Sequence, residues 1–358
     1  MTTITSSPPR SGSRWPDRFA PLAAGWLGLW GVLALVGTLT GAGYPFGAND
    51  THGGDVNLLR LVPVDLATPL FAGVLLTAAV AALAMSRPAV RPPGPLRALL
   101  AGYGWAVAFL LAVVVPDVRV LIVLGYLPIL IVGAPFGWPP VEYSDVFNWA
   151  LFGRFAALAG GLLLAGAVFA WQRRTAGACV GCGRGDTDQG WNTPAAAARW
   201  GRWAAGIAAA IPLAYASTRF AWAAGIPLGI SREFLTEMQD NGMVWAGFGL
   251  AAFATVGAIL TLGLVQRWGE RFPRWMVGLA GRRVPVLLAV APATLVAIAV
   301  TAASLGLLSN PKFWELTGGT SLTGAPMLLW PVWGVALGAA TYAYHLRRRG
   351  ACRLCGRG

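Results

Sequence analysis

Residues 243–265 read MVWAGFGLAAFATVGAILTLGLV, a run without a charged side chain. A helix needs about 20 consecutive apolar residues to cross a membrane, because the hydrocarbon core of a bilayer is about 30 Å thick and a helix rises about 1.5 Å per residue. This run therefore predicts a transmembrane helix.

Similar runs recur along the chain, which is 56% hydrophobic and 11% charged with a mean hydropathy of +0.61. So much apolar surface cannot be buried in one water-soluble core. We predict an all-α polytopic membrane protein of about eight transmembrane helices, over residues 21–43, 67–86, 98–115, 149–171, 203–224, 243–265, 285–308 and 326–346.

The N-terminal end and one central segment differ from the other apolar runs. The first span is too long for a signal-peptide core, so we expect it to be retained, preceded by a disordered Ser/Thr/Pro-rich tail over residues 1–13. Residues 120–133 are apolar but short, which favours a re-entrant or interfacial segment over a ninth span.

The distribution of basic residues predicts the orientation. Twenty-one Arg residues lie within 10–18, 87–97, 173–202, 267–283 and 347–357, on alternate sides of the spans. The other loops hold only Arg60, Arg119, Arg232 and Lys312. By the positive-inside rule, both termini are predicted to be cytoplasmic in the cell membrane.

Two landmarks recur in the same order and predict an internal duplication. Gly43-Tyr-Pro-Phe-Gly47 follows the first span and Gly225-Ile-Pro-Leu-Gly229 the fifth; Cys179-Val-Gly-Cys182-Gly closes the fourth and Cys352-Arg-Leu-Cys355-Gly the eighth. We predict one four-helix repeat over 14–185, a cytoplasmic linker over 186–202 and a second repeat over 203–358. An even number of spans per repeat gives both the same orientation, so the repeats are parallel.

Small residues spaced four apart occur at matching distances before the two cysteine motifs. Gly161 and Ala165 in the fourth span correspond to Gly334 and Gly338 in the eighth. Such pairs let membrane helices approach closely, against each other or against another neighbour. One hypothesis is that the fourth and eighth spans pack together and bring the cysteine motifs side by side.

All four cysteines belong to these motifs: Cys179, Cys182, Cys352 and Cys355. Two Cys-x-x-Cys pairs can supply the four thiolates of a tetrahedral zinc site, and a Gly after the second Cys suits the required tight turn. Redox chemistry and reduced, unliganded thiols are the alternatives. We call each Cys-x-x-Cys-Gly sequence a knuckle.

Two arginines lie inside predicted spans, Arg154 in the fourth and Arg219 in the fifth. Ionisable residues at such positions commonly face a cavity or an ion-pair partner. An outward-facing site for an anionic substrate, with Asp145, Glu142 or Glu233 nearby, is one interpretation, and snorkelling to the headgroups is the other. Residues 49–57 also gather oxygen and imidazole groups, which suit either a divalent cation or a plain turn.

Several cofactors and partners are not expected. The only lysine, Lys312, is not part of a phosphate-binding Gly-x4-Gly-Lys-Ser/Thr loop, so we expect no nucleotide. The two histidines, His52 and His345, lie far apart in the predicted topology, which argues against a haem. The basic residues lie at the ends of apolar runs and indicate a lipid bilayer as the partner rather than nucleic acid.

The stretch YASTRFAWAAGIPLG over residues 215–229 resembles a motif in uncharacterised multi-pass membrane proteins of actinobacteria. The first repeat keeps only the Gly-x-Pro-x-Gly part of it. The resemblance implies a membrane protein of that kind and no activity.

Three classes of function are compatible with these features. Parallel repeats favour transport or permeation not driven by ATP. A scaffold or regulatory protein whose cytoplasmic metal knuckles dock a protein partner is the second class, and a membrane enzyme using the outer polar residues or the thiols is the third.

Overall fold

The structure is a computed structural model that describes residues 15–43, 50, 57–87, 94–136, 142–185, 190–316, 324–352 and 354–356. These residues form an all-α protein without a named β-strand, as the sequence predicts. The tail over 1–13, most of the Gly43–Gly47 motif and His52 lie outside the described residues.

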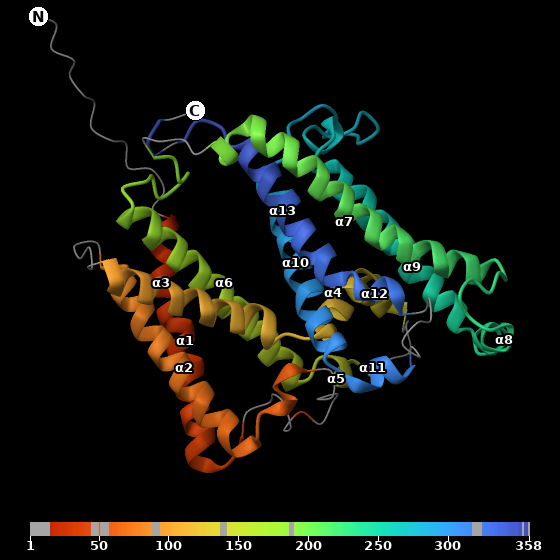
Figure 1. Cartoon of the computed structure of the whole chain (residues 1–358), viewed down its shortest axis with the longest axis horizontal. Helices are drawn as coiled ribbons and strands as arrows, with labels where there is room; N and C mark the ends of the chain where they lie inside the picture. The colour runs from red at the N-terminus through yellow and green to blue at the C-terminus, as the bar shows by residue number, and fades with distance from the viewer. Residues whose placement is uncertain are drawn as a thin grey trace, which may run out of the picture.

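The first group of helices occupies one side of the molecule (Figure 1). Its members are α1 (Trp15–Thr40), α2 (Val64–Ser86), α3 (Gly94–Phe109), which continues into a π-helical turn (Leu110–Val114), and α6 (Trp149–Thr175). Much of the shared core consists of alanines such as Ala23, Ala78 and Ala167, none of which is exposed. Such small residues allow membrane helices to pack closely.

The second group lies beside the first (Figure 1). It comprises α7 (Pro194–Ala223), α9 (Met243–Gly263), α10 (Val286–Leu308) and α13 (Trp330–Arg348). α7 packs against α9 and α13, and α13 packs against α10. The shorter helices α5 (Tyr143–Val146), α8 (Arg232–Asp240), α11 (Pro311–Leu316) and α12 (Ala325–Leu328) lie in the connections.

Six of the described helices are long and apolar enough to cross a membrane: α1, α2, α3 with its π-helical turn, α6, α9 and α10. They coincide with six of the predicted spans. The other two predictions, 203–224 and 326–346, fall on α7 and α13, which are helical but less apolar. The prediction of a polytopic helical membrane protein is confirmed, and the count of eight stays a prediction.

Basic side chains fix which helix ends lie together. Arg174 at the end of α6 donates to the carbonyl of Met85 at the end of α2 and pairs with Asp17 at the start of α1. Arg347 at the end of α13 donates to the carbonyl of Leu264 just after α9. We call this end of the molecule, where α6 and α13 lead into the cysteines, the knuckle end.

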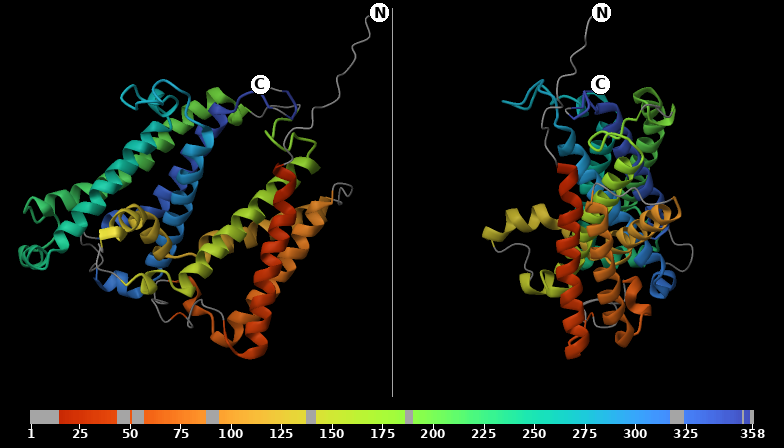
Figure 2. Two further views of the ribbon diagram at one scale, coloured as in Figure 1. Left: turned by 180° about the vertical axis from the view of Figure 1, so that it is seen from behind. Right: turned by 90° about the vertical axis from the view of Figure 1, so that its left-hand side faces the viewer.

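The segment that was ambiguous in the sequence forms α4 (Val118–Gly133). α4 packs against α10 and runs across the direction of α1 (Figure 2). Together with the π-helical turn, it buries an apolar cluster between the two groups that includes Val120, Leu158 and Ala299. Residues 120–133 therefore help to join the two groups.

The two glycines predicted to bring the fourth and eighth spans together have other neighbours. A Cβ on Gly161 would lie 2.9 Å from the Ala108 carbonyl oxygen of α3 and 2.8 Å from the Ala112 nitrogen of its π-helical turn. A Cβ on Gly334 would lie 3.0 Å from the Ala297 carbonyl oxygen of α10. The hypothesis that these glycines join α6 to α13 is therefore wrong. Each glycine packs its helix against the third long helix of its own group.

Candidate metal centre

The two knuckles have the same backbone turn. The N–H of Gly183 donates to the carbonyl of Cys179, and the N–H of Gly356 donates to that of Cys352, each at 2.7 Å. Both glycines have a positive φ, +73° and +74°, which residues with a Cβ rarely adopt. The glycine after each second cysteine is therefore required by the turn.

The four cysteine sulfurs form one compact cluster. All lie within 4.8 Å of one another, and the closest pairs join the two knuckles: Cys179 to Cys352 at 3.7 Å and Cys182 to Cys355 at 3.6 Å. Four sulfurs at about 2.3 Å from a tetrahedral zinc ion are about 3.8 Å apart. The geometry is therefore able to hold one metal ion, as the spacing predicted.

Arginines hold the two knuckles against each other. Arg184, just after the first knuckle, donates to the carbonyl of Gly350 at 3.1 Å, and Arg349, just before the second, donates to the carbonyl of Cys182 at 3.0 Å. Within the first knuckle, Arg173 donates to the carbonyl of Val180 at 2.9 Å. These bonds satisfy carbonyls in the turns and fix the relative position of the two pairs of thiols.

The thiols of Cys182 and Cys352 differ in how readily they ionise. Burial raises the pKa of Cys182 to about 12, and hydrogen bonds with the neighbouring thiols act in the same direction. For Cys352, partial burial is outweighed by the N–H groups of Cys355 and Leu354, which donate to its sulfur and lower its pKa to about 6. A thiolate at Cys352 is therefore accessible near neutral pH, as binding of a thiophilic cation requires.

The arrangement resembles a metal site more than a redox Cys-x-x-Cys motif. In a redox motif, the two thiols of one motif react with each other at the start of a helix. Here both knuckles follow the end of a helix, and the shortest sulfur contacts run between the knuckles. The cluster thus depends on both halves of the chain.

A second polar site lies near the other end of α6. The Arg154 side chain is fully buried, and its Nε donates to Asp117 at 2.6 Å while its Nη2 pairs with Asp50. Arg119 pairs with the same two carboxylates. Asn57 donates to Asp117 and to the carbonyl of Val115. We call Asp50, Asp117, Arg119 and Arg154 the ion-pair network.

The network neutralises its own charges, with two carboxylates and two guanidinium groups. Burial alone would raise the pKa of Asp117, but Arg119 and Arg154 together lower it below the usual value. The sequence interpretation missed Asp50 and Asp117 as partners of Arg154. The available signal was an acid and a base two residues apart, Asp117 and Arg119, directly after a span.

The other predicted substrate residues lie elsewhere. Arg219 on α7 is 7% exposed, lies over the rings of Tyr215 and Trp222 at 3.9 and 4.6 Å, and donates to the hydroxyl of Thr218. The acids Glu142, Asp145 and Glu233 are exposed, and within the described ranges no ion pair joins any of them to Arg154 or Arg219.

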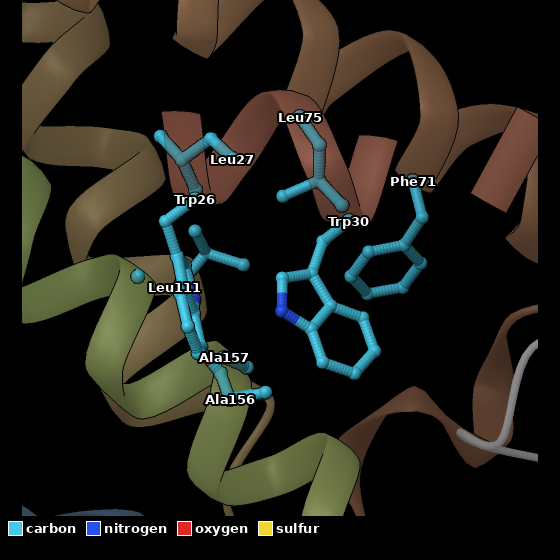
Figure 3. Close-up of a pocket in the computed structure, with 9 residues that line it drawn as sticks. Trp26, Leu27, Trp30, Phe71, Leu75, Leu111, Ala156 and Ala157 are labelled. Carbon is cyan, nitrogen blue, oxygen red and sulfur yellow. The ribbon is translucent and has the colours of Figure 1, made fainter. Parts of the chain in front are cut away.

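A small cavity lies between α1, α2, α3 and α6, lined by Trp26, Trp30, Phe71 and Ala156 among others (Figure 3). Its volume is about 10 Å³, which is room for at most one water molecule. The indole N–H of Trp30 is buried there and has no hydrogen-bond partner among the described residues. The cavity is too small for a substrate.

Comparison with known proteins does not assign the chain to a family. No family model matches the chain, and no curated protein or solved structure is significantly similar to it.

Proposed function

We propose that one zinc ion, bound by Cys179, Cys182, Cys352 and Cys355, fastens two halves of an integral membrane protein to each other on the cytoplasmic side. The observation that carries the proposal is the cluster of four sulfurs, two from each half, within 4.8 Å. An all-thiolate tetrahedral set is typical of structural zinc, which has no open position for a reactant.

The halves are proposed to be parallel repeats. Arg174 and Arg347 both lie five residues before the first cysteine of their knuckle, and each donates to a carbonyl at the end of the second long helix of its group. Gly161 and Gly334 both lie eighteen residues before the first cysteine of their knuckle, and each packs on the backbone of the third long helix of its group. These matching contacts support an internal duplication.

Metal analysis tests the zinc proposal. We expect protein purified without added metal to contain about one zinc per chain, because two knuckles form one site. The measurement is elemental analysis by mass spectrometry, with protein concentration from amino-acid analysis. Metal-free protein whose four thiols all react with an alkylating reagent would contradict the proposal.

For the membrane part we propose transport or permeation not driven by ATP. The supporting observation is that two separately packed helix groups meet through one apolar cluster and the cysteine cluster. Arg154 on α6 and Arg219 on α7 are buried charged side chains. Arg219 is the proposed contact for an anionic substrate. Arg154 could join it only if Asp50 and Asp117 released it, and Glu142, Asp145 and Glu233 are proposed at the outer entrance.

Flux measurements test this role. We expect proteoliposomes to take up at least one of a panel of small organic anions, with about tenfold less uptake for Arg219→Ala, since a direct charge-assisted contact contributes roughly 1.5–3 kcal/mol. Arg219→Lys is expected to keep part of the uptake, and Arg232→Ala, at an exposed arginine, all of it. Equal uptake by wild type and Arg219→Ala would rule out this contact.

A scaffold role remains a second proposal, supported by the position of the cysteine cluster outside the membrane-spanning helices. A cytoplasmic protein that co-purifies with wild type and is lost with Cys352→Ser would favour it over transport.

A further inference from the structure

A large apolar groove lies between α9 and α10. Its volume is about 800 Å³, within the range of about 300–1,000 Å³ typical of small-molecule sites. Leu260 on α9 and Pro292 on α10 line its walls, and Trp333 and Leu337 on α13 lie between them. In the first group, the corresponding helices α2 and α3 pack against each other.

The groove extends from the knuckle end to about the middle of the helices. The phenol of Tyr344 on α13 donates to the carbonyl of Gly269 in the loop that closes the groove, and Trp333 marks its deep end. These two positions on α13 are about 17 Å apart at the usual helical rise. This depth matches one leaflet, about 15 Å of hydrocarbon.

The loop over 265–285 gives the groove a basic and apolar rim. Its arginines are all exposed, and none has an ion-pair partner within the described part of the chain: Arg267, Arg271, Arg274, Arg282 and Arg283. The one acid of the loop, Glu270, pairs with Arg347 and Arg348 of α13. Trp275 and Val277 are 78% and 97% exposed. Arginine beside exposed tryptophan is typical of a segment at the membrane interface.

We infer that this groove binds an anionic phospholipid of the leaflet at the knuckle end, with one acyl chain between α9 and α10 and the phosphate at the arginines of the loop. The occupant must be apolar along one leaflet and negatively charged at its end, and a phospholipid with a net negative headgroup has both properties. Basic clusters next to membrane helices commonly recognise such headgroups.

Native mass spectrometry of the full chain tests the inference. The protein, in detergent, is mixed with equal amounts of palmitoyl-oleoyl phosphatidylglycerol and phosphatidylcholine. We expect one retained lipid per chain, with phosphatidylglycerol preferred at least tenfold, because its headgroup carries a net negative charge, whereas the choline cation of phosphatidylcholine neutralises the phosphate. Replacing Arg271, Arg274, Arg282 and Arg283 by Gln should abolish the preference, whereas Arg199→Gln with Arg202→Gln, exposed arginines on α7, should leave it unchanged.

A second variant tests the acyl-chain site. Gly257 lines the groove, and no heavy atom lies within 4 Å of the position of an added Cβ. Gly257→Leu should therefore place its side chain in the groove and reduce retention of either lipid at least tenfold. Gly249→Leu is the matched control, since Gly249 lies on the same helix, has equal space and does not line the groove.

Other results would overturn the inference. Equal retention of the two lipids by wild type would show an unselective apolar surface. Unchanged retention by Gly257→Leu would place the lipid elsewhere. A dimer in wild type that disappears in Gly257→Leu would assign the groove to a second copy of the chain.

Discussion

Cys179→Ser is expected to lose the bound zinc and to lower the free energy of unfolding by about 3–5 kcal/mol. Structural zinc contributes about 10–16 kcal/mol in small zinc-finger peptides. A smaller effect is expected here, because the apolar cluster around Leu158 and Ala299 also joins the two groups. A serine hydroxyl stays protonated near neutral pH and cannot replace a thiolate. Metal content and thermal unfolding in detergent are the measurements.

Two controls distinguish the loss of zinc from the loss of a disulfide or a change in the loop. Ala176→Ser adds a hydroxyl at an exposed position between α6 and the first knuckle. This variant should change neither the metal content nor the thermal stability. A chelator should lower the stability of wild type to that of Cys179→Ser and should not change the variant further. If a reductant rather than a chelator produced this shift, the sulfurs would act as disulfides and the zinc proposal would be wrong.

The long helices could be predicted because a bilayer imposes a length and an apolar composition on each span. The run over 243–265 forms α9 (Met243–Gly263) almost as predicted. α7, however, begins at Pro194 rather than near 203. Hydropathy reports only the apolar part of a helix. The start of α7 is set instead by the hydroxyl of Thr193, which caps the helix by accepting a hydrogen bond from the N–H of Ala196.

The cysteine cluster was predictable from spacing, because four thiolates in two short motifs have few structural uses. The route by which the knuckles meet was not. The contacts of Gly161 and Gly334 depend on which neighbour each helix turns toward, and a small-residue motif predicts close packing without naming the partner.

The ion-pair network shows a stronger limit of sequence reasoning. Arg154 lies 37 residues from Asp117 and 104 from Asp50 along the chain. No periodicity connects residues at such separations. Their contact depends on how the segment after α3 folds back across α6, and this geometry is set by tertiary packing.

Arg154→Met is expected to lower the free energy of unfolding by about 3–5 kcal/mol, because removing one member of a buried ion pair leaves an uncompensated charge. The uncompensated negative charge belongs to the carboxylates of Asp50 and Asp117, whose side chains are 0% and 1% exposed. Thermal unfolding in detergent measures the effect. Arg199→Met makes the same substitution at an exposed arginine of α7 and should have little effect, since surface ion pairs and charges contribute about 0–1 kcal/mol.

Restoring neutrality distinguishes charge from packing. In Arg154→Met with Asp50→Asn, the remaining pair is Arg119 with Asp117, joined at 2.6 Å. If the cost of Arg154→Met is the buried negative charge, this double variant should be more stable than Arg154→Met alone, even though it carries one more substitution. If the losses of stability from Arg154→Met and from Asp50→Asn simply add, the network stabilises the fold through side-chain packing. Non-additivity of this sign is expected only for groups that share one buried network.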